Sequence, residues 1–350
     1  MPIVSVWRNK SVLLLLSLLP FLAAEAHIEY DTVSLVRLNK QHAFPKNIPP
    51  GNYSGITYLG NNRYAVVSDK SEEDGFFVFS IAIDSVSGVI TDVKSLGFKS
   101  SNQPNRDGEG IAYVPEWGEI FISGETNNDI LAYGLDGHLT SRSVQVPAAY
   151  HHIRHNLGLE ALSYSAQTHR LWTCNEAPLQ GDGVPASPTF HGRNVLRMQS
   201  FSDSLLPMEQ YFYRMDAPTV HRKARFYAIG VGDIIALSDG SLLVLEREFY
   251  VPRAKIGGFV RQKLYQTFPD KAAESTQKAA TEAIACMAKQ LVCAWKTTFG
   301  LLNRSFANYE GMCLGPRLSD GSQVIVLVSD SQNQYGGLLK DWFKTIIVKP

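Results

Sequence analysis

Residues 107–125 read DGEGIAYVPEWGEIFISGE, and the fold can be predicted by working outward from this stretch. Two acids flank a glycine, an apolar run follows, Trp117-Gly118 reverses the chain, and a second apolar run ends at Glu125. Apolar runs on both sides of a short glycine-containing turn predict a β-hairpin. The predicted hairpin therefore begins and ends with carboxylates.

The same plan recurs four times along the chain. An acid, or a serine in the first copy, precedes a short strand, a turn follows, and a second strand ends in an acid. The copies are YSGITYLGNNRYAVVSD (53–69), NLGLEALSYSAQTHRLWTCNE (156–176), VGDIIALSDGSLLVLERE (231–248) and YEGMCLGPRLSDGSQVIVLVSD (309–330). Their turns are expected at Asn61-Asn62, Ala166-Gln167, Asp239-Gly240 and Asp320-Gly321.

Further alternating runs between the copies, such as residues 76–83 and 195–201, predict two more strands per repeat. Four antiparallel strands repeated every ~40–50 residues are typical of a β-propeller. We therefore predict an all-β propeller with five four-stranded blades, or six if another blade lies within 177–230 or 249–307. The last copy lacks a strand, which residues 28–38 can supply by pairing the two ends of the chain. Residues 270–291 predict a helical insertion.

Composition and the N-terminus limit the function classes. Lys+Arg and Asp+Glu both number 33, so there is no basic excess to favour a nucleic-acid partner. Basic residues, an apolar run over 11–24 and Ala24-Glu25-Ala26 predict a signal peptide over residues 1–26, cleaved after Ala26. The apolar run is too short to cross a bilayer, although a membrane anchor is the alternative interpretation. We expect a secreted or periplasmic protein whose residues 27–350 form one domain.

The acids that bracket the hairpins are expected to meet. The residue before the first strand of a hairpin and the residue after the second lie at the same end, and a propeller places its first strands along the central channel. Carboxylates crowded at one mouth of the channel repel one another unless a cation offsets the repulsion. The predicted metal ligands are Glu109, Glu160, Asp233, Glu310, Asp69 and Asp330, and the candidates for a general base are Glu125, Glu176 and Glu246.

Oxygen ligands in an irregular arrangement favour Ca²⁺, which accepts 6–8 of them. Zinc is not favoured because the four cysteines, Cys174, Cys286, Cys293 and Cys313, show no metal-binding spacing. Those cysteines either pair or remain buried thiols. Taken alone, each acid is more often a turn or cap residue than a metal ligand, but glutamate is a poor turn former and recurs at both ends of the hairpins.

At this point several blocks resemble the phytase-like family, also described as having esterase-like activity of phytase. The blocks are GLEALSY, NEAPLQGDG (175–183), DIIALSDGSLLVLERE and NYEGMCLGPRLSDGSQVIVLVSD, and the resemblance covers roughly residues 50–348. It implies a secreted or periplasmic propeller that hydrolyses phosphoric or other esters. Ser54 and Ser331 depart from the expected acidic pattern. The resemblance carries the family's acids onto Glu109, Glu160, Glu176, Asp233, Glu246 and Glu310, with Arg247 beside them.

A phosphate ester also needs cations near the metal. The predicted substrate-binding residues are Arg247, Lys70, Arg106 and His155. We find no GxSxG, HExxH, Walker or GxGxxG motif. The leading hypothesis is a Ca²⁺-dependent hydrolase of small phosphate esters. The alternatives are a metal-dependent carboxylic esterase or lactonase, and a binding propeller in which calcium only stabilises the fold.

Overall fold

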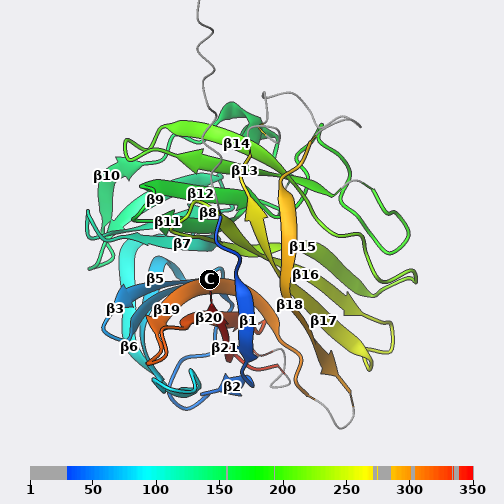
Figure 1. Ribbon diagram of the computed structural model, residues 1–350, viewed down its shortest axis with the longest axis horizontal. Helices are drawn as coiled ribbons and strands as arrows, with labels where there is room; N and C mark the ends of the chain where they lie inside the picture. The colour runs from blue at the N-terminus through cyan, green and yellow to red at the C-terminus, as the bar shows by residue number, and fades with distance from the viewer. Residues whose placement is uncertain are drawn as a thin grey trace, which may run out of the picture.

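Five four-stranded antiparallel sheets are arranged around a central axis as the blades of a β-propeller (Figure 1). The computed structural model describes residues 30–154, 157–192, 194–270, 274, 285–300, 304–332, 334 and 339–349. Within these residues there is no α-helix, and one 3₁₀ turn spans Ala148–His152. The predicted signal peptide, 1–26, lies outside the described residues.

Each of the first four blades is built from consecutive strands. Blade 1 contains β3 (Tyr53–Gly60), β4 (Arg63–Ser68), β5 (Glu73–Ile83) and β6 (Ile90–Pro104), and blade 2 contains β7 (Gly108–Val114), β8 (Glu119–Gly124), β9 (Asp129–Gly134) and β10 (Leu139–Ser143). Blade 3 contains β11 (Leu159–Ser165), β12 (Arg170–Asn175), β13 (Val195–Phe201) and β14 (Pro207–Arg214), and blade 4 contains β15 (Phe226–Ala236), β16 (Leu242–Val251), β17 (Gly258–Phe268) and β18 (Ala288–Phe299).

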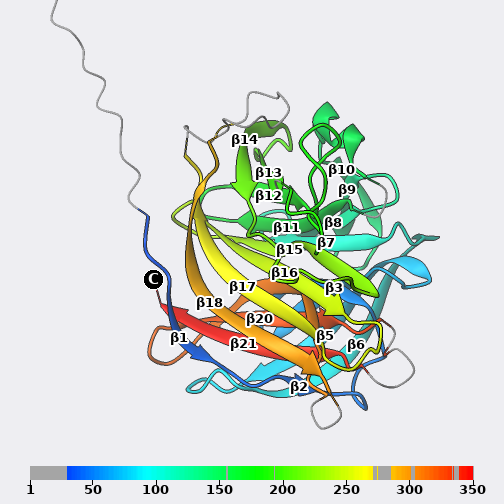
Figure 2. The ribbon, with the colours of Figure 1, turned by 90° about the vertical axis from the view of Figure 1, so that its right-hand side faces the viewer.

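Blade 5 joins the two ends of the chain, as the sequence predicts. Its strands are β19 (Asn308–Arg317), β20 (Gln323–Asp330), β21 (Trp342–Lys349) and β1 (Ser34–Leu38), and the short β2 (His42–Ala43) also pairs with β21. Figure 2 shows β1, in blue, along β21, in red. The ring is therefore closed by antiparallel pairing of the first and last strands.

The blade count is five. The two long gaps that left room for a sixth blade contain instead the outer strands β13 and β14 of blade 3 and β17 and β18 of blade 4. The expected helix over 270–291 lies largely outside the described residues. Its last four residues, 288–291, belong to β18 and are therefore strand.

The hydrophobic core is divided among the five blade-to-blade interfaces. For example, Val67 and Phe76 of blade 1 pack in one cluster with Ile111 and Ile122 of blade 2, and each of the other neighbouring pairs shares a cluster of its own. No blade buries its faces alone, so each depends on both neighbours for stability. Cys174, Cys293 and Cys313 are buried in three different blades and form no disulfide.

The inner strands approach one another so closely that glycine is required beside the channel. A Cβ atom at Gly55 would lie 2.4 Å from the carbonyl oxygen of Glu109, and one at Gly110 would lie 2.6 Å from the backbone nitrogen of Leu162. The recurrent glycine next to the first acid of the hairpins is therefore explained by packing between neighbouring backbones.

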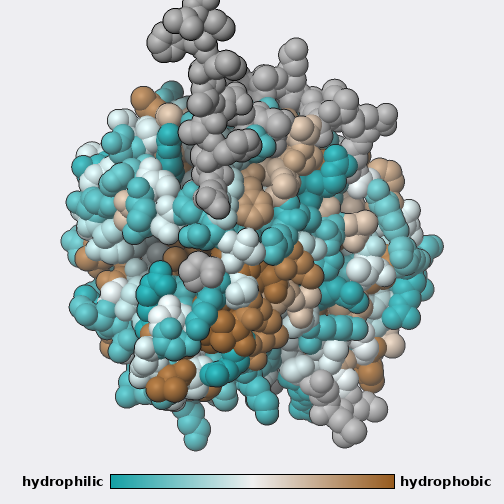
Figure 3. Space-filling view, viewed as in Figure 1, coloured by the Kyte–Doolittle hydropathy of each residue, from teal (hydrophilic) through white to brown (hydrophobic). Residues whose placement is uncertain are grey.

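The outer surface carries both hydrophilic and apolar residues (Figure 3). The face drawn in Figure 3 is largely hydrophilic, with an apolar patch in the region where Figure 1 places β1 and β18. Leu35 and Val36 of β1 and Leu291 of β18 are exposed large apolar side chains of these strands. None of the described residues belongs to a helix with the length and hydropathy needed to cross a bilayer.

Candidate functional site

A β-bulge near the start of every inner strand fixes which side chains face the mouth of the channel. The pairing of each inner strand with its neighbour shifts register there. A bulge inserts an extra residue and re-aims its side chain. The inserted residues, one in each blade, are Ser54, Glu109 (together with Gly110), Glu160, Gly232 and Glu310.

A second set of equivalent positions follows from the backbone pairing just before each bulge. Asp69 pairs with Asn52 and Glu125 with Asp107 through backbone hydrogen bonds of 3.2 and 2.8 Å. The corresponding partners in blades 3, 4 and 5 are Gly158, Gly230 and Asn308. On the second strand of each hairpin, the residues that pair with these partners are Asp69, Glu125, Glu176, Arg247 and Asp330.

Blade 4 therefore differs from the others at both positions, with Gly232 and Arg247 in place of acids. The repeat pattern predicts that Asp233 and Glu246 correspond to the acids of the other blades, but the register places both of them one residue away. Because neighbouring residues of a strand point to opposite faces, a shift of one residue removes a side chain from the mouth.

Asp233 and Glu246 are used to hold blades together. The carboxylate of Asp233 is buried and accepts hydrogen bonds from the backbone nitrogens of Ile234, at 2.8 Å, and Met312 of blade 5, at 2.6 Å. Glu246 accepts hydrogen bonds from the hydroxyl of Tyr213 in blade 3, at 2.7 Å, and from Lys289, at 2.6 Å. Their expected roles as metal ligand and general base do not agree with these surroundings.

The remaining predicted acids do meet at the mouth. Burial raises the pKa of Glu109 well above its ordinary value, and the nearby charges of Glu160, Asp69, Glu310 and Glu125 raise it further. The complete set of seven predicted acids at the mouth is Asp69, Glu109, Glu125, Glu160, Glu176, Glu310 and Asp330.

The same electrostatic coupling extends around the ring. Burial raises the pKa of Glu310 to about 8. The positive charge of Arg247 opposes this rise, and the negative charge of Asp330 adds to it. Burial and the charge of Glu176 raise the pKa of Glu160, again opposed by Arg247. Desolvation and like charges together make this mouth unfavourable for so many carboxylates in the absence of a compensating cation.

Arg247 is the central cation of the cluster. Its guanidinium is buried, with 8% of the side chain exposed, and donates to Oε1 of Glu176 at 2.6 Å. It also lies 3.0 Å from Oε1 of Glu310 and 3.5 Å from Oε1 of Glu160. Its Nε–H has no hydrogen-bond acceptor among the described residues. One arginine thus pairs with three of the glutamates at the mouth.

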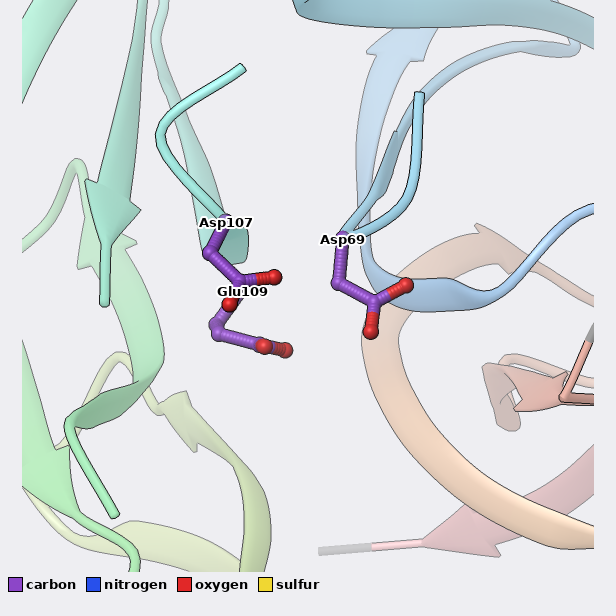
Figure 4. Close-up of side chains that lie close together, drawn as sticks. All are labelled: Asp69, Asp107 and Glu109. Atoms are coloured by element: carbon purple, nitrogen blue, oxygen red, sulfur yellow. The ribbon is translucent and has the colours of Figure 1, made fainter. Parts of the chain in front are cut away.

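Asp69, Asp107 and Glu109 form the most compact group of oxygen donors. One carboxylate oxygen of each lies within 4.8 Å of the others, and Figure 4 shows the side chains of Asp107 and Glu109 extending toward Asp69. Asp69 Oδ1 is buried and has no hydrogen-bond partner in the described part of the chain. Two oxygens on opposite sides of a calcium ion are separated by about 5 Å, twice a bond of 2.3–2.6 Å. The group therefore fits Ca²⁺ in both donor type and spacing.

Lys70 lies beside this group, since its amine is 3.0 Å from Asp69 and 2.7 Å from Asp107. Half of its side chain is exposed, so the amine can move into solvent at little cost. Asp107 was not among the predicted ligands, although it stands two residues before Glu109 in the opening stretch. Its φ of 58° is left-handed rather than extended, and a bulge follows it, so strand alternation could not show that the two side chains meet.

One other predicted substrate-binding residue, Arg106, does not join the cluster. Arg106 donates to the hydroxyl of Tyr133 at 2.7 Å and lies 3.3 Å from Asp74, so it links blades 1 and 2 away from the acids. This role in the interface differs from the expected one. His155 lies outside the described residues.

Two cavities occupy opposite parts of the molecule. One of about 400 Å³ adjoins the acids, with Arg247, Asn308 and Glu310 in its wall. The other, of about 700 Å³, is lined by the far ends of the inner strands and includes Tyr58, Tyr113 and Tyr164. We place the candidate site at the smaller cavity because the buried charges gather there.

The fold and the acidic mouth define a β-propeller with a potential cation-binding centre. Residues 48–332 match the model of the phytase-like family, described as esterase-like activity of phytase, and the chain belongs to that family. No curated protein sequence matches the chain.

Solved propellers resemble the chain only distantly. Virginiamycin B lyase from Staphylococcus aureus is 11% identical, with 90% of this chain and 99% of that chain covered and a TM-score of 0.37. A carbohydrate-active enzyme of family AA12 from Trichoderma reesei, in its calcium structure, is 9% identical, with coverage of 91% and 99% and a TM-score of 0.42. The PQQ domain of pyranose dehydrogenase from Coprinopsis cinerea is 10% identical, with coverage of 88% and 97% and a TM-score of 0.34. Similarities at this level carry no information about substrate or cofactor.

Proposed function

We propose that the protein is a Ca²⁺-dependent hydrolase of small phosphate esters, acting at the acidic mouth of the propeller. The observation that carries the proposal is the group of seven buried or half-buried carboxylates around Arg247. Carboxylates are rarely buried together unless a cation offsets their repulsion. Membership of the phytase-like family fits an enzyme that acts on esters.

Asp69, Asp107 and Glu109 are the residues that would hold the cation, because they combine close oxygen donors with an unpartnered oxygen on Asp69. A divalent cation supplies Lewis-acid polarisation of an ester oxygen. Asp330 and Glu310 lie close enough to Asp69 to influence its charge or to be influenced by it. They are candidates for completing the set of oxygen donors, of which calcium takes 6–8.

Arg247 would bind a substrate oxygen from the wall of the cavity that it lines. Glu176 holds Arg247 in place through the 2.6 Å hydrogen bond, so its role is to position the arginine. Glu125 is the remaining candidate for the general base that takes a proton from the attacking water. Its Oε1 accepts a hydrogen bond from the backbone nitrogen of Gly158 at 2.8 Å, which fixes its orientation.

A secreted or periplasmic location is part of the proposal, since a cleaved signal peptide would deliver the enzyme to compartments where weak calcium sites can be filled. Extracellular calcium modules function with dissociation constants of about 10⁻⁴–10⁻³ M. The substrate would be a small molecule that reaches the mouth from solvent.

The test is an ester panel with the purified protein. Hydrolysis of 4-nitrophenyl phosphate should stop with a chelator and return with added Ca²⁺, while Glu160→Gln should lower the rate at least about tenfold. Glu119→Gln is the matched control, because Glu119 is also a buried carboxylate but pairs with Arg142 at 2.7 Å, outside the cluster. Absence of metal-dependent turnover of any phosphate ester would overturn the proposal.

Two other outcomes would identify the alternatives. Calcium-dependent hydrolysis of 4-nitrophenyl acetate or a lactone without phosphatase activity would define a carboxylic esterase or lactonase, which the apolar wall of the adjoining cavity also suits. A melting temperature that rises with Ca²⁺ while no ester is hydrolysed would define a calcium-stabilised binding propeller.

A further inference from the structure

Blade 4 extends beyond the mouth of the channel. β15 begins at Phe226, six residues before Gly232 at the bulge, whereas β7 and β11 begin one residue before their bulged acids. β16 continues to Val251, four residues beyond Arg247, while β12 ends at Asn175, one residue before Glu176. The long strands of blade 4 therefore form a wall beside the acidic cluster.

The cavity of about 400 Å³ lies against this wall. Its apolar lining includes Phe226, Phe249, Phe299 and Phe306, and Arg247 and Glu310 lie at its polar end. Phe249 follows Arg247 by two residues on β16, so both side chains are on the same face of the strand. Phe249 and Phe306 contact each other edge to face, with ring centroids 5.3 Å apart.

The chemistry of the lining restricts what can occupy the cavity. Its exposed surface is mainly apolar, and the cations in it are Arg247, already paired with three glutamates, and Lys255. A polyphosphorylated sugar would lose its hydration there without enough cations to replace it. An aromatic ring would instead contact aromatic side chains in favourable geometry, and the volume is within the 300–1,000 Å³ range typical of small-molecule sites.

We propose that this cavity binds the aromatic part of an ester substrate, with the ester oxygens at Arg247 and the neighbouring acids. The inference rests on the proposed function and adds the substrate class. The preferred substrate is a phosphate monoester of an aromatic alcohol, not an inositol polyphosphate. Continuity between the cavity and the acidic cluster supports it, because Arg247 and Glu310 belong to both.

Ala228 provides a way to close the cavity. It lies in the cavity wall opposite Phe249 in the pairing of β15 with β16 and is half-buried. Ala228→Phe should fill the space, and Ala82→Phe is the control, because Ala82 is a half-buried alanine on β5 in another blade. Phe249→Ala enlarges the cavity and serves as an independent variant if the filled variant fails to fold.

The experiment compares 1-naphthyl phosphate with methyl phosphate and inositol hexakisphosphate on the full mature protein with Ca²⁺. We expect kcat/KM for the naphthyl ester to exceed that for the methyl ester by about 10- to 100-fold. Ala228→Phe should bring this ratio close to one, Phe249→Ala should lower it, and Ala82→Phe should leave it unchanged. A ratio near one in the wild type, or one that neither cavity variant alters, would overturn the inference.

Calorimetric binding of 1-naphthyl phosphate separates this inference from the proposed function. If no ester is hydrolysed, the proposed function fails, but tighter binding of 1-naphthyl phosphate than of methyl phosphate, weakened by Ala228→Phe, still supports the aromatic site. If esters are hydrolysed with calcium and the two ligands bind equally, the function stands and the aromatic site is excluded. Preferred binding of inositol hexakisphosphate also excludes it.

Discussion

Blades 3 and 4 are neighbours in the ring and differ in charge at two equivalent positions, with opposite charges at one of them. Blade 3 contributes Glu160 at its bulge and Glu176 after its second strand, whereas blade 4 contributes Gly232 and Arg247. The guanidinium of Arg247 contacts both glutamates of blade 3 and also Glu310 of blade 5. In a repeat protein, one blade can therefore carry other residues where its neighbours carry acids, and a basic residue at such a position partly neutralises the acids of the neighbouring blades.

The largest expected effect comes from removing the cation of blade 4. Arg247→Met keeps much of the side-chain volume but leaves three buried glutamates without their partner, and breaking a buried ion pair in this way costs about 3–5 kcal/mol. The free energy of unfolding measured with denaturant and chelator should fall accordingly. Arg63→Met, at an exposed arginine, is the control. Equal stability of the two variants would mean that blade 4 does not compensate blade 3.

The second effect is a pH dependence of the chelated protein. Glu310 has a folded-state pKa of about 8, above its ordinary value of 4.5, because burial outweighs the effect of Arg247. Between these pH values folding makes Glu310 bind more protons, so the contribution of this group to stability is fully present below pH 4.5 and is lost as the pH rises toward 8. The loss is on the order of a few kcal/mol, since one pKa unit corresponds to about 1.4 kcal/mol.

Denaturant titrations from pH 5 to 8 measure this dependence. Glu310→Gln should reduce the slope of the curve, because the amide does not ionise, while the other acids with a raised pKa, such as Glu109 and Glu160, keep the rest of the dependence. A chelated wild-type protein that becomes more stable over the same pH interval would show that the acids of the mouth are already compensated without a metal.

A smaller effect separates the residues at the mouth from their neighbours in sequence. Glu109→Gln should weaken Ca²⁺ binding by about tenfold, equivalent to 1.4 kcal/mol, because Glu109 belongs to the compact oxygen group. Glu246→Gln should leave the affinity unchanged and lower only the stability, since Glu246 bonds to Tyr213 and Lys289. Calorimetric calcium titration of both variants checks the assignment, which a similar loss of affinity in both would contradict.

The smallest expected effect concerns the glycine of blade 4. A Cβ atom at Gly232 would lie 3.2 Å from the carbonyl oxygen of Tyr309 and 3.3 Å from the Cα of Glu310. Gly232→Ala should therefore cost about 1 kcal/mol by overpacking the contact with blade 5. Thermal unfolding measures this cost, and a gain in stability would show that blade 5 moves to accept the methyl group.

The sequence was sufficient to predict the propeller because its hairpins have local signals. Turns such as Asn61-Asn62, both with positive φ, and Gly240 and Gly321 after aspartates are visible in the residues themselves. The pairing of the chain ends was predictable because the last repeat lacked one strand. These features depend on short-range patterns that survive without knowledge of the neighbouring blades.

The register of blade 4 was not predicted, because a bulge adds one residue and reverses which side chains face the mouth. In Glu-Arg-Glu (246–248), alternation alone does not say which residue faces the channel. A signal was nevertheless present: Glu109 and Glu310 come before their glycines, whereas Asp233 comes after Gly232. The interface role of Arg106 depends on Asp74 and Tyr133, which no local pattern connects to it.

The pairing of β1 with β21 has a consequence for biosynthesis. β1 leaves the ribosome among the first segments of the domain and β21 among the last, so the ring cannot close before nearly all of the domain has been synthesised. Until the final strand emerges, the apolar edges of the first and last blades have no lasting partner. A protein built in this way depends on protection of its nascent chain, and deletion of either end exposes the same edge.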